Sequence, residues 1–208
     1  MRRRLSPLLP LAVLIALALP LAACGDDPVD LPPHEAEADS LLASVTGDAW
    51  DAVFPSPGPF QTESTLGGEA SGKTLLDSAA NPLPAFLSDE PPYLDAAATE
   101  QYATCVLGDT TVAGQPARLV EARFVADGRR AQPIRLVRAA VAPEAGTLLA
   151  IEVHREVEST LFDETSRLVA ALASGPDGLV LDHSTAVTTT DVPASEPATA
   201  RVTLRRQR

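Results

Sequence analysis

Cys24 is the residue whose surroundings point most clearly to chemistry. Three arginines at positions 2–4 precede an apolar run, Leu11–Leu19, and two alanines stand directly before the cysteine. A basic segment, a short apolar core and small residues, in that order, are typical of a cleaved export signal. A membrane-spanning helix needs about 20 continuous apolar residues, and prolines interrupt this stretch on both sides of the run. The sequence therefore predicts a signal peptide over residues 1–23.

The segment Leu21-Ala22-Ala23-Cys24 resembles the lipobox of bacterial lipoproteins. The resemblance implies that Cys24 is acylated, becomes the first residue of the mature chain and anchors it to a membrane. Two lipid signals already suffice for stable anchoring. In well-studied Gram-negative lipoproteins an aspartate directly after the cysteine retains the protein at the inner membrane. Here Gly25 follows, so the resemblance favours the periplasmic face of the outer membrane and leaves the inner membrane open.

A second pattern, Gly67-Gly68-Glu69-Ala70-Ser71-Gly72-Lys73-Thr74, matches the phosphate loop G-x-x-x-x-G-K-[ST]. That motif needs a buried strand before it and a helix after it. The residues before it, 60–66, are mostly polar, and Pro82 limits any helix that follows. The sequence therefore predicts no nucleotide as partner.

Other catalytic or metal-binding patterns are weak. The three histidines, His34, His154 and His183, show no metal-ligand spacing, and no G-x-S-x-G elbow is present. The acidic pairs Asp89-Glu90 and Asp163-Glu164 are typical of solvated turns. We therefore expect no enzyme, no cofactor and no metal site, and a hydrolase is the least favoured of the alternatives.

The charge of the chain also limits its partners. Removal of the signal peptide takes away three arginines and leaves 13 basic against 28 acidic residues, a net charge of −15. Such a surface repels nucleic acid, which we exclude as a partner. Cys105 is the only other cysteine; if Cys24 is lipidated, we expect Cys105 to be a buried, inert thiol.

The mature chain divides into three parts. Residues 24–33, rich in proline and aspartate, predict a flexible lipidated tether. Residues 34–208 form a single exported domain, in which 34–100 are helical and irregular. Helical spacing from Ala38 to Val53 predicts one amphipathic helix, with a break at Gly47 left open. The many prolines of 55–100 predict irregular chain, with short helical turns near 73–80 and 93–101.

Residues 101–208 alternate between apolar and polar side chains. The alternation runs through 117–125, 134–141, 148–157, 179–190 and 200–204, with turn signals such as Asp127-Gly128 and Asp177-Gly178 between the runs. It predicts an antiparallel meander of at least five strands, with charged side chains such as Glu121, Arg138 and Glu152 facing water. Segment 159–172 fits a helix or a strand, and its position in the meander favours a strand. The fold class is therefore α+β: a curved antiparallel sheet packed against the N-terminal helix.

This order of a helix followed by a long meander resembles the half-barrel of the lipoprotein-carrier superfamily (LolA, LolB and the mycobacterial LppX type) over residues 101–205. The resemblance implies a concave face that can hold acyl chains. Alternate apolar residues of the strands, together with the helix, would line it: Trp50, Leu41, Leu42, Val45, Leu119, Val125, Leu136, Ile151 and Val153. The same residues can instead pack on one another.

Two non-catalytic functions follow for a membrane-anchored envelope lipoprotein. In the first, the protein binds or carries a hydrophobic or acyl ligand. In the second, it is a structural or protein-interaction module without a ligand site. A cavity inside the sheet favours the carrier, whereas a core filled by side chains favours the interaction module.

Lipidation is tested directly in cells. We expect Cys24→Ala to abolish incorporation of labelled palmitate, because the acyl chains have no other attachment point in the mature chain. Wild-type protein and Cys105→Ala serve as matched controls and should incorporate label equally. Equal labelling of Cys24→Ala and wild type would contradict the lipobox interpretation.

Overall fold

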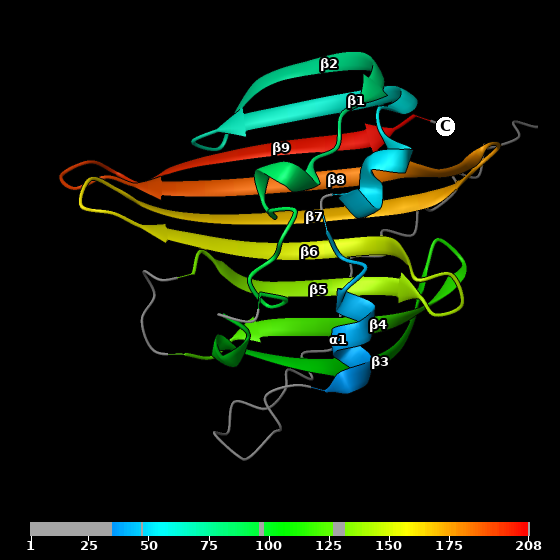
Figure 1. Ribbon diagram of the computed structural model, residues 1–208. Helices are drawn as coiled ribbons and strands as arrows, with labels where there is room; N and C mark the ends of the chain where they lie inside the picture. The colour runs from blue at the N-terminus through cyan, green and yellow to red at the C-terminus, as the bar shows by residue number, and fades with distance from the viewer. Residues whose placement is uncertain (1–34, 47, 96–97, 127–131, 208) are drawn as a thin grey trace, which may run out of the picture.

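Strands with alternating side chains build most of this protein, and they all join one sheet. The computed structural model describes residues 35–46, 48–95, 98–126 and 132–207. Its nine strands are listed in chain order: β1 Ser56–Leu66, β2 Glu69–Ala79, β3 Tyr102–Val112, β4 Gln115–Phe124, β5 Ile134–Ala142, β6 Thr147–Glu158, β7 Asp163–Gly175, β8 Gly178–Asp191 and β9 Ala198–Arg206. All neighbouring strands are antiparallel, in the order β2-β1-β9-β8-β7-β6-β5-β4-β3 (Figure 1). The predicted meander is confirmed, including a strand, β7, within 159–172.

Helical structure is sparser than the sequence predicts. Helix α1 is only Ala36–Leu42, and the rest of the expected helix is a separate 3₁₀ turn, η1 Asp48–Val53. Two further 3₁₀ turns, η2 Leu83–Ala85 and η3 Thr99–Gln101, punctuate the proline-rich chain. The interruption between α1 and η1 includes position 47, which lies outside the described residues. Among the described residues, no helix has the length and apolar character to cross a membrane.

The prediction of irregular chain over residues 55–100 is wrong for its first half. Strands β1 and β2 form a hairpin there, and the helical turn predicted near 73–80 is part of β2. Gly67 and Gly68 both have positive φ, 60° and 85°. Positive φ at both central residues is the requirement of the tight two-residue turn that best fits twisted strands.

Of the two hairpin turns predicted in the meander, the structure describes one. Gly178 connects β7 to β8 with a φ of 130°, as the Asp177-Gly178 signal predicts. The Asp127-Gly128 signal lies outside the described residues.

One face of the sheet, called here the inner face, carries the helical turns and the irregular chain (Figure 1). Helix α1 contacts β3 and β4, and η1 contacts β6 and β8. The core under them includes Trp50, Tyr93, Tyr102 and Phe60, all at most 1% exposed. Burying side chains of this size contributes about 2–3 kcal/mol each, before the entropy of ordering them.

Leu168 tests the inner core. It lies in β7 between Val153 and Ala186 on the neighbouring strands and is fully buried. We expect Leu168→Ala to lower the free energy of unfolding by about 2–5 kcal/mol, because it leaves a cavity that neighbouring strands cannot close. Urea unfolding followed by circular dichroism measures this change. Leu161→Ala, at a leucine 73% exposed, is the matched control and should change it by less than about 0.5 kcal/mol; equal losses would contradict the assigned core.

Candidate functional site

The inner core gathers most of the residues that the sequence proposed as ligand lining. Leu42, Val45, Trp50, Ile151 and Val153 belong to one cluster and are each at most 2% exposed. Leu41 is partly buried against the same cluster. Trp50 stacks on Phe54 with ring centroids 6.0 Å apart. These side chains belong to one buried apolar cluster, as the residues of a packed core do.

The other three proposed lining residues lie elsewhere. Leu119 belongs to a second, smaller apolar cluster with Ala140 and Ala150, on the opposite, outer face of the sheet. Leu136 pairs in register with Arg123 and His154, which also places it on the outer face. Val125 follows β4 and is 56% exposed. The nine residues therefore do not line one site.

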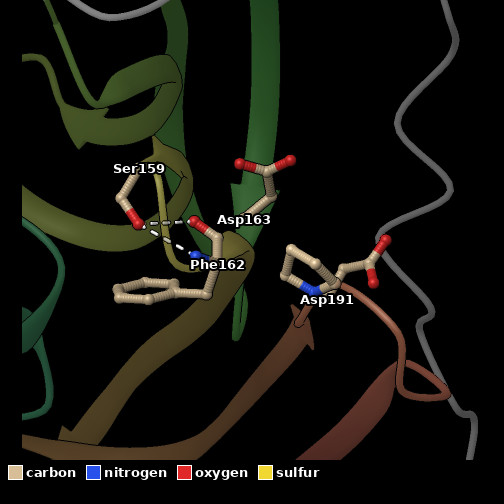
Figure 2. A pocket seen from close by; sticks show the side chains of 5 residues that line it. Ser159, Phe162, Asp163 and Asp191 are labelled. Atoms are coloured by element: carbon tan, nitrogen blue, oxygen red, sulfur yellow. Dashed lines mark hydrogen bonds between the residues drawn. The ribbon is translucent and has the colours of Figure 1, made fainter.

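Two hollows of the described surface have linings in which polar residues are the majority. One, of about 130 Å³, lies where β6, β7 and β8 end and is lined by Ser159, Phe162, Asp163, Asp191 and Pro193 (Figure 2). The Ser159 side chain forms hydrogen bonds within the turn. Its hydroxyl donates to the Phe162 carbonyl at 2.8 Å and accepts from the N–H groups of Leu161 and Phe162. No histidine lines this hollow, and the bonds within the turn hold the Ser159 hydroxyl, so the serine is not placed as an activated nucleophile.

A larger hollow of about 440 Å³ lies on the outer face of β1 and β9. Its lining is Gln61, Glu63, Thr65, Arg201, Thr203 and Arg205. Glu63 faces Lys73 of β2 at 3.4 Å, and both side chains are about half exposed. The hollow is thus a polar depression with two arginines in an otherwise acidic protein, and it is open to solvent.

A line of charged side chains crosses the outer face from β4 to β7. Arg123 and Arg138 donate to the two oxygens of Glu121 at 2.9 and 2.7 Å. Arg167 donates to Glu152 Oε1 at 2.7 Å, and His154 Nε2 lies 2.7 Å from the same oxygen. The expectation that both carboxylates face water is wrong. Glu121 is fully buried and Glu152 is 5% exposed, because the long arginine side chains cover them.

Glu152 has an unusual acidity that follows from this arrangement. Burial alone would raise the pKa of its carboxyl, but the hydrogen bond to His154 and the charge of Arg167 outweigh burial and lower the pKa to about 2. A carboxylate held ionised between cations is a poor general acid. The network therefore fixes the neighbouring strands in register and offers no acid–base pair.

The remaining sequence motifs adopt structures that do not support their chemistry. Residues 67–74 form the β1–β2 turn and the exposed start of β2, not a loop that opens a helix, so backbone N–H groups do not converge on a phosphate there. Among the residues that the structure describes, no group of three His, Cys, Asp or Glu side chains is placed to hold a metal ion. His34 lies outside them.

Cys105 departs from its expected state. It lies in β3, is partly buried and is disulfide-bonded, so the prediction of a free thiol is wrong. The chain has one other cysteine, Cys24, which lies outside the described residues. The palmitate experiment on Cys24 decides whether that thiol is acylated.

Acid unfolding tests the buried network. The pKa of Glu152 is lower in the folded protein than in the unfolded chain, so its stabilisation is present above about pH 4.5 and is lost as the pH falls toward 2. We expect Glu152→Gln to remove about 2–3 kcal/mol of stability at pH 7 and to flatten the decline between pH 4.5 and 2. Glu144→Gln, at an exposed turn, makes the same charge change and should leave the decline as in wild type. An unaltered acid slope in Glu152→Gln would contradict the assignment.

Comparisons with known proteins show limited likeness. No protein-family model matches the chain, and no curated protein matches it. A DUF1329 family protein from Desulfovibrio piger has a TM-score of 0.31 at 10% identity and covers 82% of this chain and 92% of its own. A domain named as a putative outer membrane lipoprotein-sorting protein from Vibrio parahaemolyticus has a TM-score of 0.28 at 12% identity. The match covers 79% of this chain and 93% of the other. The Pseudomonas aeruginosa MucA/MucB complex has a TM-score of 0.29 at 9% identity, and the match covers 83% of this chain and 94% of the other. At these TM-scores the function has to be argued from this chain's own residues.

Proposed function

We propose that this protein is an exported, lipid-anchored envelope protein whose folded domain acts without catalysis as a protein-interaction module. The observation that carries the proposal is the inner face of the sheet. Six of the nine residues expected to line an acyl site belong to one packed core there. The proposal therefore favours the interaction module over the carrier of a hydrophobic ligand.

The packing of the inner core supports this choice. An acyl chain of ordinary length would need space now occupied by Trp50, Leu42 and Val45. Tyr93 reinforces the cover, because its hydroxyl donates to the Val45 carbonyl at 3.1 Å and its ring is buried. Displacing these groups would expose apolar area worth several kcal/mol and leave the Val45 carbonyl without its partner.

The distribution of exposed apolar side chains gives the second support. Leu66, Leu75, Leu76 and Val202 are between 37% and 72% exposed, and all lie on the three strands β1, β2 and β9 at one end of the sheet. Strand β2 is exposed along almost its whole length. The register places Leu66, Leu76 and Val202 on the inner face and Leu75 on the outer face, so this end of the sheet exposes apolar side chains on both faces. Exposed apolar surface is typical of contacts with other proteins.

The location rests on the sequence alone. The resemblance of residues 21–24 to a lipobox supports a lipid anchor at Cys24, and Gly25 favours the outer membrane, with its periplasmic face as the place of the domain. Residues 24–33 would serve as a tether between the anchor and the domain. The acidic mature chain would be held off anionic headgroups by charge repulsion.

The absence of catalysis is proposed from the chemistry of the polar groups. The two buried carboxylates, Glu121 and Glu152, are held by arginines. The Ser159 hydroxyl is hydrogen-bonded to backbone groups of its own turn. A hydrolase would need a nucleophile and a base, or two carboxyls with different pKa values, facing one cleft.

Trp50 provides the test between module and carrier, because it is the only tryptophan and lies at the centre of the inner core. We expect titration of soluble protein lacking residues 1–24 with fatty acids or lysolipids to give no saturable shift of its fluorescence. Mass spectrometry should find no stoichiometric lipid in the purified sample. Trp50→Phe defines the signal that does not come from the indole.

A saturable shift that Trp50→Phe abolishes, together with co-purified lipid, would overturn the interaction module and establish the carrier. The measurement needs no knowledge of the natural ligand. Any single-chain lipid that enters the core must displace groups in contact with the indole.

A further inference from the structure

The two edges of the open sheet are treated differently by the chain. At the β3 edge, the Glu35 N–H donates to the Thr104 carbonyl at 3.2 Å, and the Glu35 carboxylate accepts the Val106 N–H at 2.9 Å. These bonds occupy backbone groups that a further strand would need. At the β2 edge, no described segment pairs with the strand on the side away from β1. An open edge with unpaired backbone groups is a template for another strand.

Strand β2 is long for an edge strand, and its protection is limited to charged side chains and one register irregularity near the hairpin turn. It runs for eleven residues, contains no proline, and carries Leu75 at 72% exposure. Its register with β1 places Lys73, Leu75 and Asp77 on the outer face, since successive side chains alternate across a strand. Lys73 is the only lysine of the chain, and its amino group is exposed beside Glu63.

We propose that the β2 edge pairs antiparallel with β2 of a second copy of this chain, centred on Leu75, to make one continuous sheet across two protomers. An antiparallel pair centred on residue 75 places position 73 opposite position 77 of the other copy. Lys73 then faces Asp77 twice, once on each side of the axis, and Leu75 faces its own copy. The pairing is isologous, as a two-fold interface requires.

This register is the one that the sequence of β2 favours. A pair centred on Leu76 would place Leu75 opposite Asp77 and leave Lys73 opposite an alanine. A pair centred on Ser71 would bring Glu69 opposite Lys73, but it would use only the five residues beside the hairpin turn and would leave Leu75 exposed. Only the register centred on Leu75 satisfies both charges and covers the most exposed leucine of the strand.

The inference rests on the proposed role as an interaction module, because it names the partner. In-membrane cross-linking of the full-length protein tests it. Leu75→Cys places two thiols across the axis at a Cα separation of about 4.5–5.5 Å, within reach of a disulfide. Ser71→Cys is the matched control, because its two copies would lie about 27 Å apart. Wild type, with its two native cysteines, gives the background.

We expect non-reducing electrophoresis to show a dimer for Leu75→Cys and only background for Ser71→Cys. Adding Lys73→Asp should lower the cross-linked fraction about fivefold or more, because two like-charged cross-strand pairs replace two opposite ones. Adding Asp77→Lys to that variant should restore it, since the charges are then complementary again. A purely structural effect of Lys73→Asp, through its contact with Glu63, would not be rescued by a change at position 77.

Each other outcome overturns the proposal. If Leu75→Cys gives no dimer above background, the proposed interface is wrong. If Ser71→Cys cross-links more strongly than Leu75→Cys, the proposed register is wrong. An adduct of Leu75→Cys with a different protein removes the second copy as occupant, yet it leaves the interaction module standing. A positive lipid titration at Trp50 removes the module independently of the cross-linking result.

Discussion

Two tyrosines hold the irregular chain onto the inner face of the sheet, and the remaining packing depends on them. Tyr93, from the proline-rich segment, bonds to the Val45 carbonyl, and Tyr102, at the start of β3, donates to the Ile134 carbonyl at 2.8 Å. Their rings meet edge to face at 6.0 Å, and Tyr102 meets Phe124 at 5.4 Å in the same way. Burial raises the pKa of both phenols, so both stay neutral donors. Three segments distant in sequence are thereby fixed over the sheet.

This arrangement explains how so little helix covers so large a sheet. Helix α1 spans seven residues and cannot shield nine strands. Large side chains on irregular segments supply the cover, and hydrogen-bonded phenols satisfy backbone carbonyls that a helix would otherwise satisfy internally. The cover reaches Phe60 of β1 but leaves other parts of β2, β1 and β9 open, including the exposed side chains Leu66, Leu76 and Val202. The filled core and the open surface are thus two consequences of one distribution of bulky residues.

The meander could be predicted because alternation and turn signals there agree, as in the runs that became β4, β5, β6, β8 and β9. Strand β7 was favoured only because of its position between two such runs. The β1–β2 hairpin could not be predicted with the same rules. Prolines at 55, 57 and 59 obscured its start, and the polar residues of β1 hide its period. Its best signal, Gly67-Gly68, was absorbed into a phosphate-loop pattern. Both glycines have positive φ, so the hairpin turn accounts for them without any ligand.

The lining residues could be predicted only in part, for a different reason. Alternation assigns two sets of residues to two faces, but both faces of this sheet bury apolar side chains, as the second cluster around Leu119 shows. Parity alone therefore cannot say which set meets the helix. Irregularities in register, such as the one between Ile134 and Leu136, reverse the parity within a strand. Buried Glu121 was missed because its burial depends on arginines from neighbouring strands.

The position of the two sheet edges relates the proposed pairing to the proposed anchor. Glu35, where the described chain begins, lies at the β3 edge, at the opposite end of the nine-stranded order from β2. In an antiparallel pair across β2, the two copies of Glu35 would stand at opposite ends of the combined sheet. Both outer faces would lie on one side, because antiparallel pairing within a sheet keeps its faces continuous. The polar hollows with Arg201 and Arg205 would then flank the axis on that side. The pairing would thus gather Lys73, Arg201 and Arg205 of two acidic chains near the centre of the pair.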